Sequence, residues 1–236
     1  MKYPVGKKYY INRKLALLKE FDDTVRIWSP VVHGLYGEIN AYRILQEARA
    51  AFEALIRQIP YIGGDANRRT VTFVESIRYL AFYRAMKKYG KTAEETGKVL
   101  FDALVAQVNK KQQKTPPAEW KNTEKYFKER EKGAEESQER RYPGDYVYKF
   151  VSGDGKKFDY GYDYSECASV KFFQAQKADE FMPFYCYLDY PVCGARGLGL
   201  SRTMTLAEGH EKCNHRFKPG RETKLAWPPP FLKRKK

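Results

Sequence analysis

The amino-acid sequence predicts an α+β fold, in which a helical N-terminal half packs on a C-terminal antiparallel sheet with inserted helices. Two observations predict this class. Through residues 1–112 apolar side chains recur every three or four positions, which is the period of a helix buried on one side. After Pro143 they alternate with a period of two, and tyrosine, phenylalanine and valine become frequent, as in strands. Helices that precede the strands, instead of alternating with them, are typical of α+β proteins.

Helices are expected throughout the N-terminal half. Their ranges are 11–28, about 35–59, about 69–89, and a fourth that begins after residue 92. Pro30 and Pro60 are expected to end the first two, because proline lacks the N–H that a helix interior needs. Gly90 is expected to end the third. Thr92 and Glu95 have the spacing of a capping box, which marks the start of the fourth helix.

The composition changes between the two halves. Residues 113–142 are highly charged and have few apolar anchors, which predicts a solvated helical connector or a mobile one. The chain then divides into a helical region (1–112), this connector, a sheet region with helices that carries the site (143–220), and a basic, proline-rich tail (221–236). We expect one integrated domain, because the helical region can pack on the sheet.

Strands open the C-terminal half. The expected elements are a strand at 145–151, a turn at 152–155, an extended segment at 158–162, and a helix from Ser165 to about residue 175. The stretch 178–190 is ambiguous between helix and strand. Pro183 fits the first turn of a short helix there, and Pro191 is expected to end it.

The stretch 197–218 concentrates reactive side chains. Its alternation over 200–206 predicts a strand, Gly209 supplies a reversal, and 213–217 predicts a returning strand. A thiol, an imidazole, carboxylates, an arginine and several hydroxyls therefore lie within one predicted hairpin. No other stretch is as dense in such groups, so the hairpin is the first candidate for a functional site.

Composition argues against several classes of protein. The net charge of +15 is spread along the chain and mixed with 29 acidic residues, so we expect no specific binding of nucleic acid. The sequence has no run of about eighteen apolar residues and no apolar segment behind its first basic residues, so we expect no membrane span and no secretory leader. The four cysteines form no CxxC pair, which favours free thiols in the cytoplasm over a disulfide scaffold.

Three clusters of residues could carry chemistry, and the first lies at 161–167. Asp163 is expected at a strand end, and Glu166 and Cys167 are expected to open the next helix. A thiol at a helix N-terminus is shifted towards the thiolate by the helix dipole. The alternative is that Cys167 is a small buried hydrophobe and that Glu166 merely suits a first helical turn.

The second cluster is the returning strand of the hairpin. Cys213 and His215 are two residues apart and point the same way, so they could form a thiol–imidazole pair. The alternative is a core face in which the histidine is hydrogen-bonded and takes no part in chemistry. His210, Cys213 and His215 could also bind a metal, but their spacing matches none of the usual zinc motifs, so no metal is expected.

The third cluster combines Asp189 with Arg202 and Glu208. An arginine beside a pocket can bind a substrate carboxylate through two parallel hydrogen bonds. The hydroxyl of Thr203, the next residue along the chain, is a further candidate for substrate binding. Arg202 and Asp189 could instead form a structural ion pair, and the sequence leaves the two readings open.

Over these residues the chain resembles the L-2-amino-thiazoline-4-carboxylic acid hydrolase family. The matching pieces are GKKFDYGYDYSECASVKFF (155–173), FYCYLDYP (184–191) and LSRTMTLAEGHEKCNHRFK (200–218), and the helical segment 89–95 fits more loosely. The resemblance is strongest over residues 155–218. It implies a hydrolase that opens a five-membered cyclic amidine carrying a carboxylate and gives a carbamoyl-cysteine type product.

Amidine hydrolysis requires groups that hold the amidinium, a nucleophile and an acid/base group. The resulting hypothesis gives these roles to Cys213 (nucleophile), Cys167 (reserve nucleophile), His215 (acid/base), Asp163, Glu166 and Glu208 (amidinium) and Arg202 (carboxylate). We expect a small-molecule substrate and no cofactor, and leave a homo-oligomer open.

The chain departs from the family pattern directly after Cys213. The family usually has an aspartate and then a phenylalanine there, whereas this chain has Asn214 and His215. The substrate can therefore differ from that of the family. The difference also leaves open an alternative function, that of a small-molecule-binding or accessory protein with the same fold and no turnover.

Overall fold

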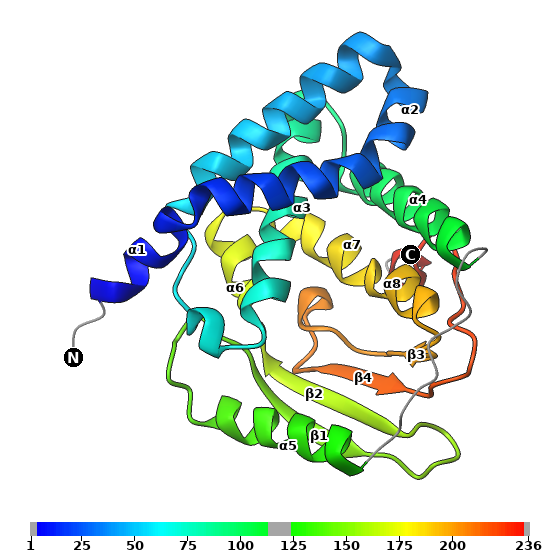
Figure 1. Ribbon diagram of the computed structural model, residues 1–236. Coiled ribbons are helices and arrows are strands. Elements are labelled where there is room, and N and C mark those ends of the chain that lie inside the picture. Colours follow the sequence, from blue (N-terminus) through cyan, green and yellow to red (C-terminus); the bar gives the residue numbers. More distant parts are fainter. Residues whose placement is uncertain (1–3, 113–123, 234–236) are drawn as a thin grey trace.

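Helices cover one face of a four-stranded antiparallel sheet (Figure 1). The computed structural model describes residues 4–112 and 124–233. The helices are α1 (Pro4–Asn12), α2 (Lys14–Ile56), α3 (Thr70–Lys88), α4 (Ala93–Gln112), α5 (Glu124–Gln138), α6 (Ala168–Ala175), α7 (Met182–Tyr187), α8 (Asp189–Ala195) and α9 (Pro230–Lys233). Short 3-10 turns are η1 (Gly64–Ala66), η2 (Asp179–Phe181) and η3 (Leu206–Glu208). The strands β1 (Val147–Ser152), β2 (Tyr160–Glu166), β3 (Leu200–Ser201) and β4 (Cys213–Phe217) lie in the order β1-β2-β4-β3. The predicted α+β class, with a helical N-terminal half and a C-terminal sheet, is confirmed.

Helix α2 corrects the prediction that Pro30 separates two helices. Pro30 lies inside α2, and the non-helical backbone is at Gly37, with φ 73° and ψ 166°. Glycine tolerates this conformation because it has no Cβ. The helix doubles back, so that its two arms lie side by side (Figure 1). The rings of Phe21 and Phe52 stack between the arms at 5.0 Å, and Arg49 bonds to Asp22 at 2.8 Å. Packing between the arms stabilises a helix that the proline alone would weaken.

The next two helices follow the prediction closely. α3 occupies residues 70–88, and α4 begins with the predicted capping box. The backbone N–H of Glu95 donates to Thr92 Oγ1 at 3.1 Å, and the N–H of Thr92 donates to a Glu95 carboxylate oxygen at 2.8 Å. α3 is buried on most sides, since it packs between α2 and α6. A polar side chain on the inner side of α3 is therefore surrounded by protein, as Ser76 is.

The sheet presents a row of tyrosines to the helices. The register pairs Tyr148 with Tyr164, Tyr164 with Cys213, and Tyr162 with His215. Cross-strand partners lie on one face of a sheet, so the cysteine and the histidine of β4 continue the tyrosine row. This inner face is buried, whereas the alternate residues, such as Asp163, point to the other side.

Helix α5 is the described part of the charged connector, and it packs along the edge strand β1. The Ser137 hydroxyl donates to the Tyr148 carbonyl at 3.0 Å and accepts from the Tyr148 N–H at 3.1 Å. Gln138 also donates to that carbonyl, at 2.8 Å. These bonds satisfy backbone groups that an edge strand would otherwise leave unpaired. The part of the connector at 113–123 lies outside the described residues.

Three local predictions in the C-terminal half are wrong. Ser165 does not cap a helix: β2 extends to Glu166, and α6 starts after Cys167, whose backbone is extended. Pro191 does not end a helix but lies in the first turn of α8, where its missing N–H costs nothing. The hairpin has no long outgoing strand, because β3 ends at Ser201 and an irregular loop with η3 follows.

The tail folds back over the helices. Trp227 packs against the rings of Phe101 and Phe184 at 5.4 and 6.2 Å, and the Tyr187 hydroxyl donates to the Ala226 carbonyl at 2.7 Å. Phe231, on α9, is buried. The predicted basic cluster at 233–236 lies largely outside the described residues.

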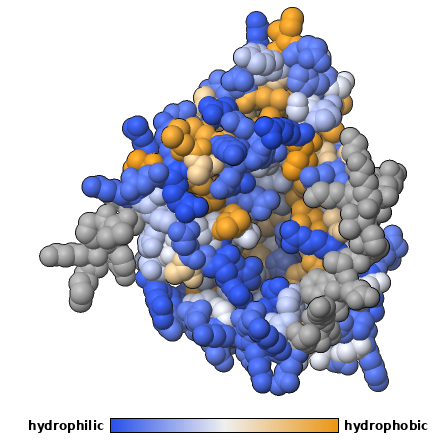
Figure 2. Space-filling view, viewed as in Figure 1, coloured by the Kyte–Doolittle hydropathy of each residue, from blue (hydrophilic) through white to orange (hydrophobic). Residues whose placement is uncertain are grey.

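Polar groups dominate the face of the molecule that Figure 2 shows. Figure 2 shows hydrophilic side chains over α5 and the lower part of the molecule, and hydrophobic patches mainly over the upper, helical part. Among the helices that the structure describes, none combines the length and the apolar character needed to cross a bilayer.

Candidate active site

The loop between β3 and β4 is shaped by Asn214. Its side-chain oxygen accepts from the backbone N–H groups of Thr203 and Met204 at 2.9 and 2.8 Å, and its amide donates to Thr203 Oγ1 at 2.7 Å. An aspartate could accept from the same two N–H groups. The departure from the family pattern at residue 214 is therefore compatible with the same loop conformation.

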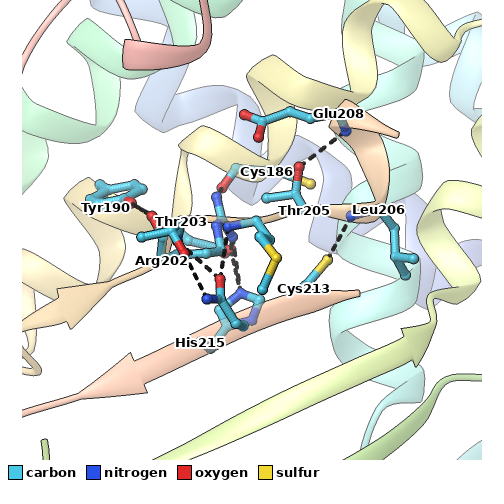
Figure 3. Close-up of polar contacts among 12 residues, drawn as sticks. Cys186, Tyr190, Arg202, Thr203, Thr205, Leu206, Glu208, Cys213 and His215 are labelled. Atoms are coloured by element: carbon cyan, nitrogen blue, oxygen red, sulfur yellow. Dashed lines mark hydrogen bonds and ion pairs between the residues drawn. The ribbon is translucent and has the colours of Figure 1, made fainter. Parts of the chain in front are cut away.

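The η3 turn brings the backbone of the loop to the Cys213 thiol. Thr205 caps the turn by accepting from the Glu208 N–H at 3.1 Å. The Leu206 N–H donates to Cys213 Sγ at 3.1 Å (Figure 3). A backbone donor at this distance favours the thiolate form of the cysteine.

Arg202 is the centre of a buried polar cluster. One of its nitrogens donates to Asp189 Oδ2 at 2.8 Å and contacts His215 Nε2 at 2.9 Å, and the other donates to the Cys186 carbonyl at 2.8 Å. The Arg202 side chain is 5% exposed, whereas the Asp189 side chain is 49% exposed. In Figure 3 Arg202 and His215 point towards one another. The structure thus forms the ion pair between Arg202 and Asp189, which is one of the two interpretations that the sequence left open.

The contact with Arg202 defines the protonation of His215. A guanidinium can only donate, so His215 Nε2 accepts and the ring proton is on Nδ1. Burial lowers the pKa of His215, and the charge of Arg202 lowers it further, against the opposing effect of Asp189. The imidazole is therefore neutral. Its Nδ1 is buried and has no hydrogen-bond partner among the described residues.

Asp189 stays ionised in this setting. Burial raises its pKa, but the positive charge of Arg202 and the hydrogen bond that Arg202 donates hold the pKa below the usual range. The carboxylate is half-exposed, so it is open to water on one side. It is the anionic group of the cluster that a ligand could approach.

Three of the predicted substrate-binding residues line one cavity, which we call the hairpin cavity. Its lining consists of Pro183, Tyr187, Tyr190, Arg202, Thr203, Met204, Thr205, Glu208, Pro230 and Phe231. Arg202 and Glu208 place opposite charges on its walls. The volume is about 30 Å³, room for one or two water molecules. A five-membered ring would need the loop or α9 to move.

Burial disfavours the thiolate form of all four cysteines. Burial raises the pKa of Cys167 and Cys193 to about 12. It also raises the pKa of Cys186 and Cys213, against the lowering effect of Arg202 and, at Cys213, of the Leu206 N–H. Cys213 and His215 share a sheet face, but His215 Nε2 is directed at Arg202 and Asp189. The neutral thiol is thus the resting form.

This pKa shift makes a prediction for alkylation. In the native protein, iodoacetamide should modify Cys213 more slowly near neutral pH than it does in urea, and the rate should increase as the pH rises above about 9, because only the thiolate reacts. Peptide mass spectrometry at a series of pH values measures the rate. Equal rates at pH 7 in native and urea-unfolded protein would show that the thiol is already activated.

Two of the predicted residues lie apart from the hairpin cavity. Asp163 projects from the outer side of β2 and pairs with Lys212 at 2.9 Å and Arg216 at 2.7 Å. Glu166 pairs with Arg140 and Lys171. Cys167, in contrast, lies near enough to Cys213 that a negative charge on Cys213 would raise the pKa of Cys167. Both carboxylates are held by cations, so neither is free to hold an amidinium in this arrangement.

Sequence reasoning missed Glu75. It lies on α3, between buried apolar residues such as Val74 and Ile77. Burial raises its pKa, and the negative charge of Asp189 adds to that effect while Arg78 and Arg196 oppose it. A carboxyl with a raised pKa near a carboxylate with a lowered one is a pattern of acid/base sites. The signal in the sequence was a single acidic residue in a helix whose other charged residues are all basic.

The predicted histidines do not form a metal site in the described ranges. His210 is exposed, and its Nε2 lies 3.7 Å from Glu208. Across residues 4–112 and 124–233 no three histidine, cysteine or acidic side chains converge as metal ligands would.

Comparison with known proteins identifies a family whose sequence model matches this chain. The sequence model described as L-2-amino-thiazoline-4-carboxylic acid hydrolase matches residues 72–217, more than half of the chain. The matched range contains Glu75, Asp189, the whole loop after β3, and β4. No curated protein and no solved structure gives a match.

Proposed function

The chain belongs to the L-2-amino-thiazoline-4-carboxylic acid hydrolase family, and we propose that it hydrolyses a small cyclic amidine that carries a carboxylate. The observation that carries the proposal is the pair of opposite charges on the wall of the hairpin cavity. Arg202 is complementary to a carboxylate, and Glu208 is complementary to an amidinium. A molecule with both groups matches this arrangement better than a ligand of single charge.

Arg202 is suited to hold the substrate in one orientation. Its guanidinium is fixed by Asp189, His215 and the Cys186 carbonyl, so little side-chain entropy is lost when a ligand binds. Glu208 is also held, since its side chain is only 17% exposed and its N–H donates to Thr205. Two fixed charges align a zwitterionic substrate along the loop, next to Cys213.

Cys213 is the proposed nucleophile. Its sulfur adds to the amidine carbon, the thiol proton passes to a carboxylate of the site, and the ring C–S or C–N bond breaks as the leaving atom takes up a proton. Water then adds to the same carbon and displaces the Cys213 thiol, which leaves a carbamoyl product. Glu75, with its raised pKa, is the proposed acid for the leaving atom. Because burial raises the pKa of Cys213, transfer of the thiol proton must accompany attack.

The test is turnover of 2-amino-thiazoline-4-carboxylate by the wild-type protein and two cysteine variants. Cys213→Ala should lower kcat at least about 100-fold, because it removes the nucleophile. Cys193→Ala is the matched control: Cys193 is also buried, but it lies on α8 and has no role in the proposed mechanism. Its kcat should stay within about threefold of wild type. A folded Cys213→Ala protein with the wild-type rate would disprove covalent catalysis by this thiol.

A second candidate function is binding of the same ligand class without turnover. The observation that favours it is that burial raises the pKa of every cysteine, Cys213 included. Calorimetric titration with the same amidine carboxylate separates the two functions. Binding that is lost in Arg202→Met, with no product formed over hours, would support the binding protein. Product formation supports the hydrolase.

A further inference from the structure

A second cavity lies between the start of α3, helix α5 and the tyrosine row of the sheet. Its lining consists of Arg68, Arg69, Tyr126, Glu129, Arg130, Tyr148 and Tyr162, and its volume is about 260 Å³. We call it the Arg–Tyr cavity. It shares no lining residue with the hairpin cavity. It is several times larger and has room for a small molecule.

The charges of the Arg–Tyr cavity are unbalanced. Arg68 donates to the Glu129 carbonyl at 3.1 Å, and Arg130 donates to the Tyr162 hydroxyl at 2.9 Å. In the part of the chain that the structure describes, neither they nor Arg69 form an ion pair with a carboxylate. The neighbouring Arg140, by contrast, pairs with Glu166. Glu129 is the one acidic residue in the lining, so three guanidinium groups against one carboxylate leave a local excess of positive charge.

Arg69 and Arg130 are held in place by aromatic rings. The Arg69 guanidinium lies 4.7 Å from the ring centre of Tyr148, 5.5 Å from that of Tyr162 and 5.4 Å from that of Tyr164. Arg130 lies 3.9 Å from the ring centre of Tyr126. Attraction to a ring face compensates part of the cost of burying a cation, but a ring does not replace a hydrogen-bond acceptor.

Both arginines retain an unused donor. The Nε atoms of Arg69 and Arg130 are buried and have no hydrogen-bond partner among the described residues. A buried donor without an acceptor is costly, and native structures rarely keep one without a reason. Tyr162 links the two arginines, since Arg69 lies over its ring and Arg130 donates to its hydroxyl. The missing component is a group with several acceptor atoms and a negative charge.

We propose that the Arg–Tyr cavity binds a small ligand through an oxyanion, either a carboxylate or a phosphate group. The planar fork of arginine binds both groups through pairs of hydrogen bonds. The tyrosine rings supply flat apolar surface for the remainder of the ligand. The inference is independent of the proposed hydrolase activity, because it concerns other residues and another cavity.

The test measures binding of two probes, inorganic phosphate and acetate, to the full-length protein at constant ionic strength. A probe that binds should raise the melting temperature by about 3 °C when its concentration is about ten times its Kd. A response to phosphate alone identifies a phosphate site, and a response to acetate alone identifies a carboxylate site. Responses to both indicate that the cavity accepts either group.

Variants assign the binding to the cavity. Arg69→Gln and Arg130→Gln should each weaken the binding of the responding probe at least about tenfold. Arg26→Gln is the matched control, because Arg26 is a surface residue paired with Asp23 and its side chain is 79% exposed. It removes the same charge and should leave Kd unchanged. If Arg69→Gln does not fold, Arg130→Gln, on the less buried α5, decides the result.

Two results would overturn the proposal. One is the absence of a response to either probe up to about 50 mM, because a specific site of this size should bind its ligand more tightly than that. The other is binding that Arg130→Gln and Arg26→Gln reduce equally, because that would reflect net charge and not the cavity.

Discussion

Replacing Asp189 by alanine is expected to lower the free energy of unfolding by about 3 kcal/mol, because the change leaves a buried arginine without its carboxylate. Arg202 is only 5% exposed, so bulk water solvates its guanidinium poorly. Its two other partners, His215 and the Cys186 carbonyl, are neutral and do not replace the lost charge. The half-exposed Asp189 places the effect near the lower end of the range for buried pairs. Urea denaturation of both proteins measures the difference.

The matched control is Asp65→Ala. Asp65 also pairs with an arginine, Arg13, at 3.1 Å, but the two side chains are 76% and 43% exposed. Loss of such a surface pair should cost less than about 1 kcal/mol. Equal costs for the two substitutions would mean that Arg202 is not held as a buried cation, and the proposed anchor for the substrate carboxylate would fail with it.

The elements that could be predicted from sequence are those whose signal is local. The capping box of Thr92 and Glu95 is contained in four consecutive residues. The helical period of α3 can be recognised from the residues of that helix alone. Pro30 misled the prediction because the packing that keeps α2 helical, between Phe21 and Phe52, joins residues far apart in the sequence. The length of the outgoing strand of the hairpin was overestimated for a similar reason. The alternating residues after Ser201 form a loop, which Asn214 holds from the other strand.

The candidate site was predictable only in part. Arg202 with Asp189 was one of two stated readings, and the structure forms that ion pair. Asp163 was placed with the site because it is near Cys167 in the sequence, but a period of two puts it on the opposite face of β2. Glu75 could not be assigned to the site from the sequence. The carboxylate whose charge raises its pKa, Asp189, lies on a helix more than a hundred residues later in the chain. Convergence of distant segments is a property of tertiary structure, which a single sequence does not display.

The second large effect is expected for Gly161→Ala, which should lower the free energy of unfolding by about 2–3 kcal/mol. Gly161 lies in β2 opposite Arg216 of β4. A Cβ at this position would overlap the backbone carbonyl of His215 and lie 2.8 Å from Cδ of Arg216. The arginine side chain can move, but the carbonyl belongs to the strand. The only relief is separation of β2 from β4, which breaks the ladder that carries Cys213 and His215.

Gly34→Ala is the control with the same chemical change and the opposite expected sign. Gly34 is exposed within α2, and an added Cβ there meets nothing within 4 Å. Alanine should therefore stabilise the protein by up to about 1 kcal/mol, because it is the better helix former. Urea denaturation of the two variants tests the close approach of β2 and β4 directly. A neutral Gly161→Ala would show that the two strands can move apart at no cost, and His215 would then not be held against Arg202 by the sheet. Reduced stability together with weaker binding of the amidine carboxylate would show instead that the sheet positions the site.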